Sequence, residues 1–329
     1  MMLCLGSLPN LQAQGNSEFL PGSKEDIFSV VWVKNWPSAI ENKKSRTVKA
    51  RLNSILFGIR TPELKNPVAI IAANLEDFWI LDQGNKTVFH TVKGVGDIPH
   101  PITKTGFDLA SLVGLCSLSD GSVLFTDSRS RKIYCISESK KKLQVFSDTL
   151  QLEQPTGIAY LPEKKQIWVL ETAAHRIAVL NESGNLIKRF GTRGDAPGEF
   201  NFPTHIWADG KGLIYVTDAM NFRIQVLDPE GNVVSVFGEA GDASGYMARP
   251  KGTATDSHGN IYVVDALFHV VQVFDIKGTF LYKFGNQGHG NEEFWMPSGI
   301  YIDKEDYIYV ADTYNSRIQI FQLTTTHEK

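Results

Sequence analysis

Cysteine, uncompensated charge and long apolar stretches are all scarce in this sequence of 329 residues. No run approaches the roughly 18 apolar residues that a membrane-spanning helix needs. The formal net charge of −3 creates no basic field, so we expect no nucleic-acid partner. A P-loop, a G-x-S-x-G elbow and an H-E-x-x-H pair are also missing, which excludes the chemistries that these motifs support.

The few cysteines predict no disulfide within the folded domain. Cys116 and Cys135 lie in apolar runs that we expect to be the first and third strands of one sheet. Two strand steps separate such residues by about 9–10 Å, whereas a disulfide needs Cα atoms within about 7 Å. The pair should therefore stay reduced and buried.

The first 15 residues favour a secretory signal peptide. A short apolar stretch precedes Ala13 and Gly15, which would stand at positions −3 and −1 of a cleavage site. This reading makes the protein secreted or periplasmic. The positively charged region that begins a signal peptide is missing, so the alternative is a disordered N-terminal tail on a cytoplasmic protein.

Self-alignment divides most of the chain into six repeats. Each contains four short apolar runs separated by turn residues, and Val, Ile, Tyr and Phe alternate within the runs as in strands. Such sheets bury both faces only when they pack radially around an axis. We therefore predict an all-β, six-bladed β-propeller of four-stranded antiparallel blades. The blades are expected to start near residues 67, 112, 155, 203, 250 and 297.

The last repeat ends after three strands, so its fourth strand must come from elsewhere. Residues 51–58 contain a Phe-Gly pair at the expected distance before the first blade, and we predict that they close the ring. The propeller would then span 51–325, followed by a tail at 326–329. Residues 16–50 would form an N-terminal extension, with 26–37 as an extra strand outside the ring.

The repeated pattern P-x-G-I-x-x-D, I-Y-V-x-D, N-x-R-I-Q-V-F and F-G resembles the NHL repeat of bacterial six-bladed propellers. The likeness is clearest at 203–238 and 297–321, is recognisable at 155–191 and 250–285, and covers about 51–321. It implies the propeller fold. Such propellers serve as ligand-binding modules, scaffolds, RNA binders and occasional enzymes, so the resemblance leaves the function open.

One acid recurs at the end of the second strand of every blade, and a basic residue often follows five positions later. A group repeated six times is hard to interpret as a unique catalytic residue. We expect these acids to accept backbone hydrogen bonds at a turn and to pair with the basic residue. The six structural acids are Asp82, Asp127, Glu171, Asp218, Asp265 and Asp312.

The residues that differ between blades are better candidates for binding. Loops from the second to the third strand, and from one blade to the next, share one face of a propeller. Aromatic residues and methionine gather in these loops, as is typical of interaction surfaces. The predicted ligand or partner face comprises His175, His205, Met220, Asn221, Phe222, Phe268, His269, Trp295, Tyr314 and Asn315.

Three of these residues are also candidate metal ligands. His205 stands where four other blades have glycine, at the start of the innermost strand, and His175 and His269 lie in the flanking loops. Imidazoles that converge there could bind zinc. The peptide-amidating lyase, a related six-bladed NHL propeller, has a central zinc lined by histidines, which implies a metal-dependent lyase or hydrolase as the alternative function.

The sequence thus predicts a monomeric, non-catalytic recognition or scaffold module without a cofactor. Its expected partner is a protein, a peptide or a glycan. The alternative is an enzyme with zinc or calcium at the mouth of the channel, and RNA binding is a third possibility.

Overall fold

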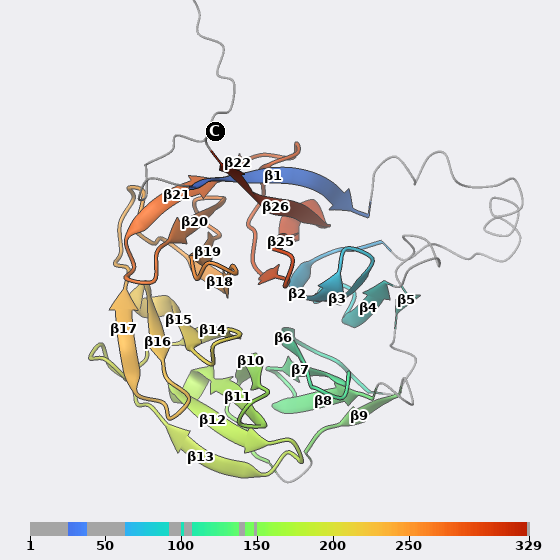
Figure 1. Ribbon diagram of the computed structural model, residues 1–329. Helices are drawn as coiled ribbons and strands as arrows, with labels where there is room; N and C mark the ends of the chain where they lie inside the picture. Colours follow the sequence, from blue (N-terminus) through green and yellow to red (C-terminus); the bar gives the residue numbers. More distant parts are fainter. Residues whose placement is uncertain are drawn as a thin grey trace, which may run out of the picture.

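The structure is a computed structural model that describes residues 26–37, 63–91, 100–101, 107–137, 142–147 and 150–327. Six four-stranded sheets surround a central axis, and β2, β6, β10, β14 and β18 lie nearest to it (Figure 1). Neighbouring strands within each sheet are antiparallel. The predicted six-bladed propeller is therefore confirmed.

The first strand begins at a repeat start in five blades and at Ile300 in the sixth. Blades one and two contain β2 (Pro67–Asn74), β3 (Asp77–Asp82), β4 (Thr87–Thr91) and β5 (His100–Pro101), then β6 (Leu112–Ser117), β7 (Val123–Asp127), β8 (Lys132–Ile136) and β9 (Leu143–Val145). Blades three and four contain β10 (Pro155–Leu161), β11 (Gln166–Glu171), β12 (Arg176–Asn181) and β13 (Leu186–Phe190), then β14 (Pro203–Ala208), β15 (Ile214–Asp218), β16 (Arg223–Leu227) and β17 (Val233–Phe237). Blade five contains β18 (Pro250–Thr255), β19 (Ile261–Asp265), β20 (Val270–Phe274) and β21 (Phe280–Phe284), and blade six contains β24 (Ile300–Ile302), β25 (Tyr307–Asp312), β26 (Arg317–His327) and β1 (Asp26–Trp36).

Short elements connect the strands on one face of the ring. Three 3₁₀ turns follow the second strands of blades three, four and six, namely η1 (Thr172–Ala174), η2 (Ala219–Asn221) and η3 (Thr313–Asn315). The loop from blade five to blade six contains a parallel pair of two-residue strands, β22 (Asn286–Gln287) and β23 (Glu293–Phe294).

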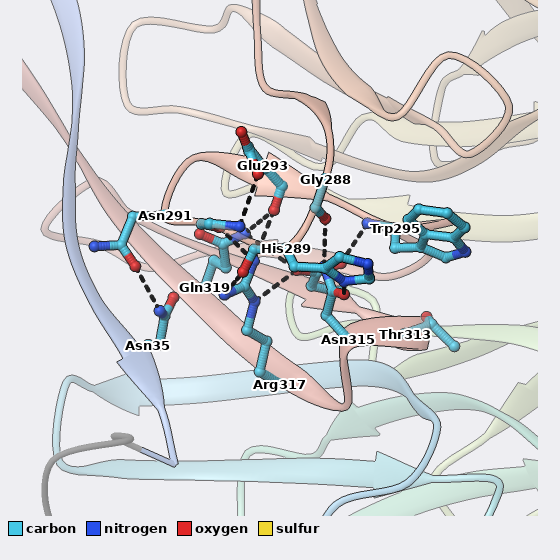
Figure 2. Close-up of polar contacts among 12 residues, drawn as sticks. Asn35, Gly288, His289, Asn291, Glu293, Trp295, Thr313, Asn315, Arg317 and Gln319 are labelled. Carbon is cyan, nitrogen blue, oxygen red and sulfur yellow. Dashed lines mark hydrogen bonds and ion pairs between the residues drawn. The ribbon is translucent and has the colours of Figure 1, made fainter.

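The ring is closed by β1, which lies along the outer edge of β26 (Figure 1). This corrects the assignment of the closing strand, because β1 occupies the place expected for residues 51–58, and its own residues were expected outside the ring. Residues 51–58 lie outside the described part of the chain, as do 1–15 and most of the predicted extension. The side-chain amide of Asn35 also donates a hydrogen bond of 2.8 Å to Asn291 (Figure 2).

The hydrophobic core consists of six layers, each between two neighbouring blades. Trp79 and Leu81 of blade one, for example, pack in one cluster with Phe125 and Tyr134 of blade two. The same arrangement recurs around the ring, and Trp36 of β1 joins the layer between blades six and one. Alternating side chains of each strand face opposite neighbours, which explains the alternating apolar pattern of the sequence.

Aspartates cap the turns between the strands. Asp228 accepts hydrogen bonds from the backbone N–H groups of Glu230 and Asn232, and Gly231 takes a φ of +96°. Glycine adopts this left-handed conformation without the strain that a side chain would add. Where Asp and Gly separate the apolar runs in this way, they determine where the strands end.

The two described cysteines are free and buried. Cys116 pairs with Leu124, which in turn pairs with Cys135, so the cysteines lie on the first and third strands as predicted. Burial, with a further contribution from Cys135, raises the pKa of the Cys116 thiol. Within the described ranges there is no helix with the length and apolar character that crossing a membrane requires.

Candidate functional site

A fully buried carboxylate ends the second strand of each blade. Asp218 accepts hydrogen bonds from the backbone N–H of Asn201 (2.6 Å) and from the side-chain amides of Asn221 (2.8 Å) and Gln225 (3.1 Å). It also forms an ion pair of 2.8 Å with the Arg223 guanidinium. Asn201 belongs to the loop from blade three, so the carboxylate joins that loop to the corner of blade four.

Arginine and glutamine on the third strand hold the same inter-blade loop. Arg317 donates hydrogen bonds to the carbonyls of His289 (3.0 Å), Gly290 (2.6 Å) and Glu293 (2.8 Å) (Figure 2). Gln319 donates a further bond of 2.6 Å to the Glu293 carbonyl. Equivalent contacts occur in blade four. These side chains thus give the long loops a defined position.

The other four blades satisfy the acid differently, and in blades one and two the carboxylates of Asp82 and Asp127 accept hydrogen bonds from backbone N–H groups. Asp265 is followed by Val270 instead of arginine, and its carboxylate accepts hydrogen bonds from backbone N–H groups within 248–249 and 267–268. Glu171 pairs with both Arg176 (2.8 Å) and Arg189 (2.7 Å). Burial by itself would raise the pKa of Glu171, but the hydrogen bonds from the two arginines bring it below its usual value.

The candidate histidines of the corner loops take part in contacts between blades. His175 has a left-handed φ of +54°, and its Nδ1 accepts a hydrogen bond of 3.1 Å from the backbone N–H of Phe202. His269 accepts the equivalent bond of 3.0 Å from Met296. Each imidazole therefore supports the residue that precedes the first proline of the next blade.

His205 occupies a position where the inner strands of other blades come too close for a side chain. A Cβ on Gly299 would lie 2.4 Å from the Val68 carbonyl, and one on Gly157 would lie 2.8 Å from the backbone nitrogen of Ile206. In blade four the imidazole instead lies in the wall of the central channel, and its Nδ1 accepts a hydrogen bond of 3.1 Å from the Thr253 N–H. Burial lowers the pKa of His205 to about 4.

The three histidines do not form a metal site of the kind that the sequence analysis considered. Each uses its Nδ1 for a different backbone N–H group. The described residues contain no group of three or more His, Cys, Asp or Glu side chains that could hold a metal ion. Among the described residues, His175, His205 and His269 are thus not gathered into one group that could share a metal ion.

The other predicted binding residues divide into internal and exposed ones. The amide of Asn315 donates to the Gly288 carbonyl (Figure 2) and to Asp312, and that of Asn221 donates to the equivalent groups of blade four, so both stabilise the loops. Phe222, Phe268 and Trp295 are half-buried, and the Trp295 ring stacks on His289 with centroids 4.9 Å apart.

Exposed apolar side chains remain on this side of blades three to six, which we call the corner face. Met220, Leu267 and Tyr314 occupy equivalent places after the second strands and are 53%, 55% and 61% exposed. Phe202 and Tyr246, in the inter-blade loops, are also exposed. The corner face therefore presents large apolar groups on a framework of hydrogen-bonded loops.

A channel of about 950 Å³ follows the axis, and the inner strands line it. The turns at 162–164, 209–212, 256–257 and 303–304 contribute to its lining. These turns join the first and second strands, so they lie at the end of the blades opposite the corner face. The sequence predicted binding on the corner face and, as the alternative, a metal at the mouth of the channel, whereas the interior of this cavity was not expected, although His205 belongs to its wall.

Three further residues in the channel were not predicted from the sequence. Lys251 stands where other blades have valine, threonine or serine, and Trp207 and Tyr301 stand where they have alanine, isoleucine or cysteine. A comparison of the repeats at these two positions, as was made for His205, would have found them.

Comparisons with known proteins agree with this geometry. Residues 127–235 and 252–329 match the model of the DUF5128 family, described as a 6-bladed beta-propeller, and these residues make up more than half of the chain. No curated protein matches the chain significantly.

Solved structures of several functions share the fold. Virginiamycin B lyase from Staphylococcus aureus is 18% identical, with a TM-score of 0.59 over 80% of this chain and 98% of that chain. An auxiliary nutrient binding protein from Bacteroides ovatus is 15% identical (TM-score 0.61; 80% and 70% covered). A gluconolactonase from Xanthomonas campestris is 12% identical (TM-score 0.61; 80% and 87% covered). At these identities the likeness concerns the fold alone.

Proposed function

The chain belongs to the DUF5128 family of six-bladed β-propellers, and from that premise we propose that it is a non-catalytic recognition module. Its partner is a protein or peptide that binds the corner face. The observation that carries this proposal is the exposure of Met220, Leu267 and Tyr314 at equivalent places in three successive blades. Large apolar groups gathered on one face are typical of protein interaction sites.

The order of the surrounding loops supports this role. Arg223 and Arg317 hold the loops before blades four and six, and Asp218 and Asp312 anchor them. A surface that is already ordered loses less conformational entropy on binding. In this proposal the repeated acids act as structural groups beneath the interface.

Three finer assignments belong to the same proposal. We infer that the repeats are of the NHL type, because the P-x-G-I and N-x-R-I-Q patterns recur at the blade starts and corners. The apolar N-terminus ending in Ala13 and Gly15 supports export, and auxiliary nutrient binding proteins share the fold. The module acts as a monomer toward its partner.

Site-specific photo-crosslinking in cells that make the protein tests the corner face. A photoreactive phenylalanine analogue at Leu267 should capture one defined partner, and the analogue at Ile276 should not, because Ile276 is exposed in a turn on the other side of blade five. Replacing Met220 and Tyr314 by serine should abolish the capture and leave the melting temperature unchanged. Equal capture from both positions would contradict the proposal.

A metal-dependent enzyme is the competing function. Elemental analysis of the purified protein distinguishes the two, because a catalytic zinc or calcium would be stoichiometric and would be lost in His205→Ala. That result would contradict the proposal of a recognition module and support an enzyme.

A further inference from the structure

The inner strands that line the channel carry one charged side chain, and no described residue neutralises it. Lys251 lies on β18 and lines the channel half-buried. Among the described residues none forms a hydrogen bond or ion pair with its ammonium group. Burial lowers the pKa of Lys251, and the nearby Arg249 lowers it further. A charge that is partly removed from water and has no partner is destabilised, so an anion beside Lys251 would be favoured.

The described acids of the channel follow the far ends of the inner strands, whereas Lys251 lies near the start of β18, and none of them forms an ion pair with it. Asp209, Asp256 and Asp303 line the mouth, in the turns that follow the inner strands. Each accepts backbone N–H bonds within its own turn and a tyrosine hydroxyl from the second strand. Glu163 lies in the equivalent turn of blade three. The charge within the described part of the inner-strand lining is therefore positive.

Two further polar groups line the channel beside Lys251. The Nδ1 of His205 accepts the Thr253 N–H, so the neutral ring carries its proton on Nε2, which has no described partner. The Tyr301 hydroxyl also pairs with no described residue, and burial, aided by the charge of Asp303, raises its pKa to about 12. Both groups are hydrogen-bond donors at neutral pH.

Aromatic surface adjoins these donors. Trp207 and Tyr301 meet edge to face, with ring centroids 5.3 Å apart, across the inner strand of blade five. Small residues of that strand, including Ala254, make room for the contact. The indole N–H of Trp207 is already used by Thr255 (3.0 Å), so the ring offers chiefly apolar surface to the channel.

We propose that the central channel binds an organic acid, whose carboxylate pairs with the Lys251 ammonium and whose apolar body packs against Trp207 and Tyr301. His205 Nε2–H and the Tyr301 hydroxyl supply further hydrogen bonds. A volume of about 950 Å³ is ample for such a ligand. This site lies inside the ring, with Lys251 toward the corner-face end of the channel, and it uses none of the exposed residues that are proposed to bind the partner.

Calorimetric titration with 1-naphthaleneacetate and with its neutral amide tests this assignment. The intact protein should bind the acid at least ~10-fold more tightly than the amide, because only the acid can pair with Lys251. Lys251→Met should remove this preference, since the substitution keeps the stem and deletes the charge. Lys304→Met is the matched control, because Lys304 is exposed at the channel mouth, and it should keep the preference.

Equal binding of acid and amide to the intact protein would overturn the proposal, as would failure of the acid to bind at millimolar concentration. A preference that survives in Lys251→Met would also overturn it. The comparison of the two ligands uses the unaltered chain, so it decides the question even if a variant does not fold.

Discussion

The hydroxyl of Thr204 is buried and has no hydrogen-bond partner among the described residues. In blade three the equivalent Thr156 pairs with Thr172 at 2.6 Å, and Thr172 also donates to the carbonyl that begins the next blade. Ser298 and Thr313 repeat this pair in blade six at 2.7 Å. Blade four has an alanine where these blades have the second threonine, which explains the unpaired hydroxyl.

Ala219→Thr should therefore stabilise the propeller. The new hydroxyl can pair with Thr204 and donate to the Pro250 carbonyl, which we expect to add about 1 kcal/mol to the free energy of unfolding in denaturant titrations. Thr172→Ala creates the same defect in blade three and should cost a similar amount. A loss of stability in Ala219→Thr would contradict the explanation.

His205 should make stability depend on pH in the acid range. Burial lowers its folded-state pKa to about 4, whereas an unfolded histidine titrates near 6.5. Between these values the unfolded chain binds a proton that the folded chain does not. The contribution is thus fully present above pH ~6.5 and is lost as the pH falls toward ~4, with a slope of up to about 1.4 kcal/mol per pH unit.

Denaturant titrations between these pH values check this expectation. His205→Asn can keep an acceptor for the Thr253 N–H and cannot titrate, so its stability should depend less on pH. The matched control is His258→Asn, in an exposed turn, which should behave like the unaltered protein. An unchanged slope in His205→Asn would show that other groups cause the acid sensitivity.

Among the elements, β1 is the strand that closes the ring. It pairs with β26 over ten residue pairs, interrupted by one register shift between Trp32 and Lys34. Without it β26 would present an unpaired edge, the feature that promotes association of sheets. Trp36 at its end is buried against Phe78 of blade one, so the strand also anchors the first blade.

Linking β1 to β26 by a disulfide should stabilise the ring. Ser29 and Thr324 face each other in register, and their hydroxyls lie 2.8 Å apart. Cysteines at both positions would close a loop of nearly 300 residues, with an upper limit of about 5 kcal/mol. The melting temperature should rise when the disulfide forms and should return to the original value when the disulfide is reduced.

An off-register pair is the control for this linkage. Ser29→Cys combined with Gln322→Cys should form little disulfide, because Gln322 pairs with Val31 instead. Ready oxidation of this pair would mean that β1 adopts another register on β26.

At the scale of the whole molecule, the two proposed sites lie at different places on one ring. Inter-blade core layers and the closing strand hold the blades together, so both sites rest on a common rigid framework. The corner face offers apolar side chains on ordered loops, whereas the channel offers donors and aromatic surface. We therefore expect large partners at the first and small ligands at the second.

The sequence by itself determined the fold class and the corners. Alternating apolar runs and Asp-Gly turns act locally, and a motif repeated six times reveals its structural role because each copy solves the same packing problem. The buried corner acids and the separated, reduced Cys116 and Cys135 could be predicted for this reason.

Only the tertiary structure decided which strand closes the ring and which side chains meet in the channel. Two N-terminal segments, 26–37 and 51–58, had apolar patterns suitable for the closing strand. The segment that pairs with β26 does so through contacts between residues from opposite ends of the chain. Lys251, Trp207 and Tyr301 come from three different blades, and radial packing brings them to one wall. Their proximity depends on the closure of the ring, which no local pattern encodes.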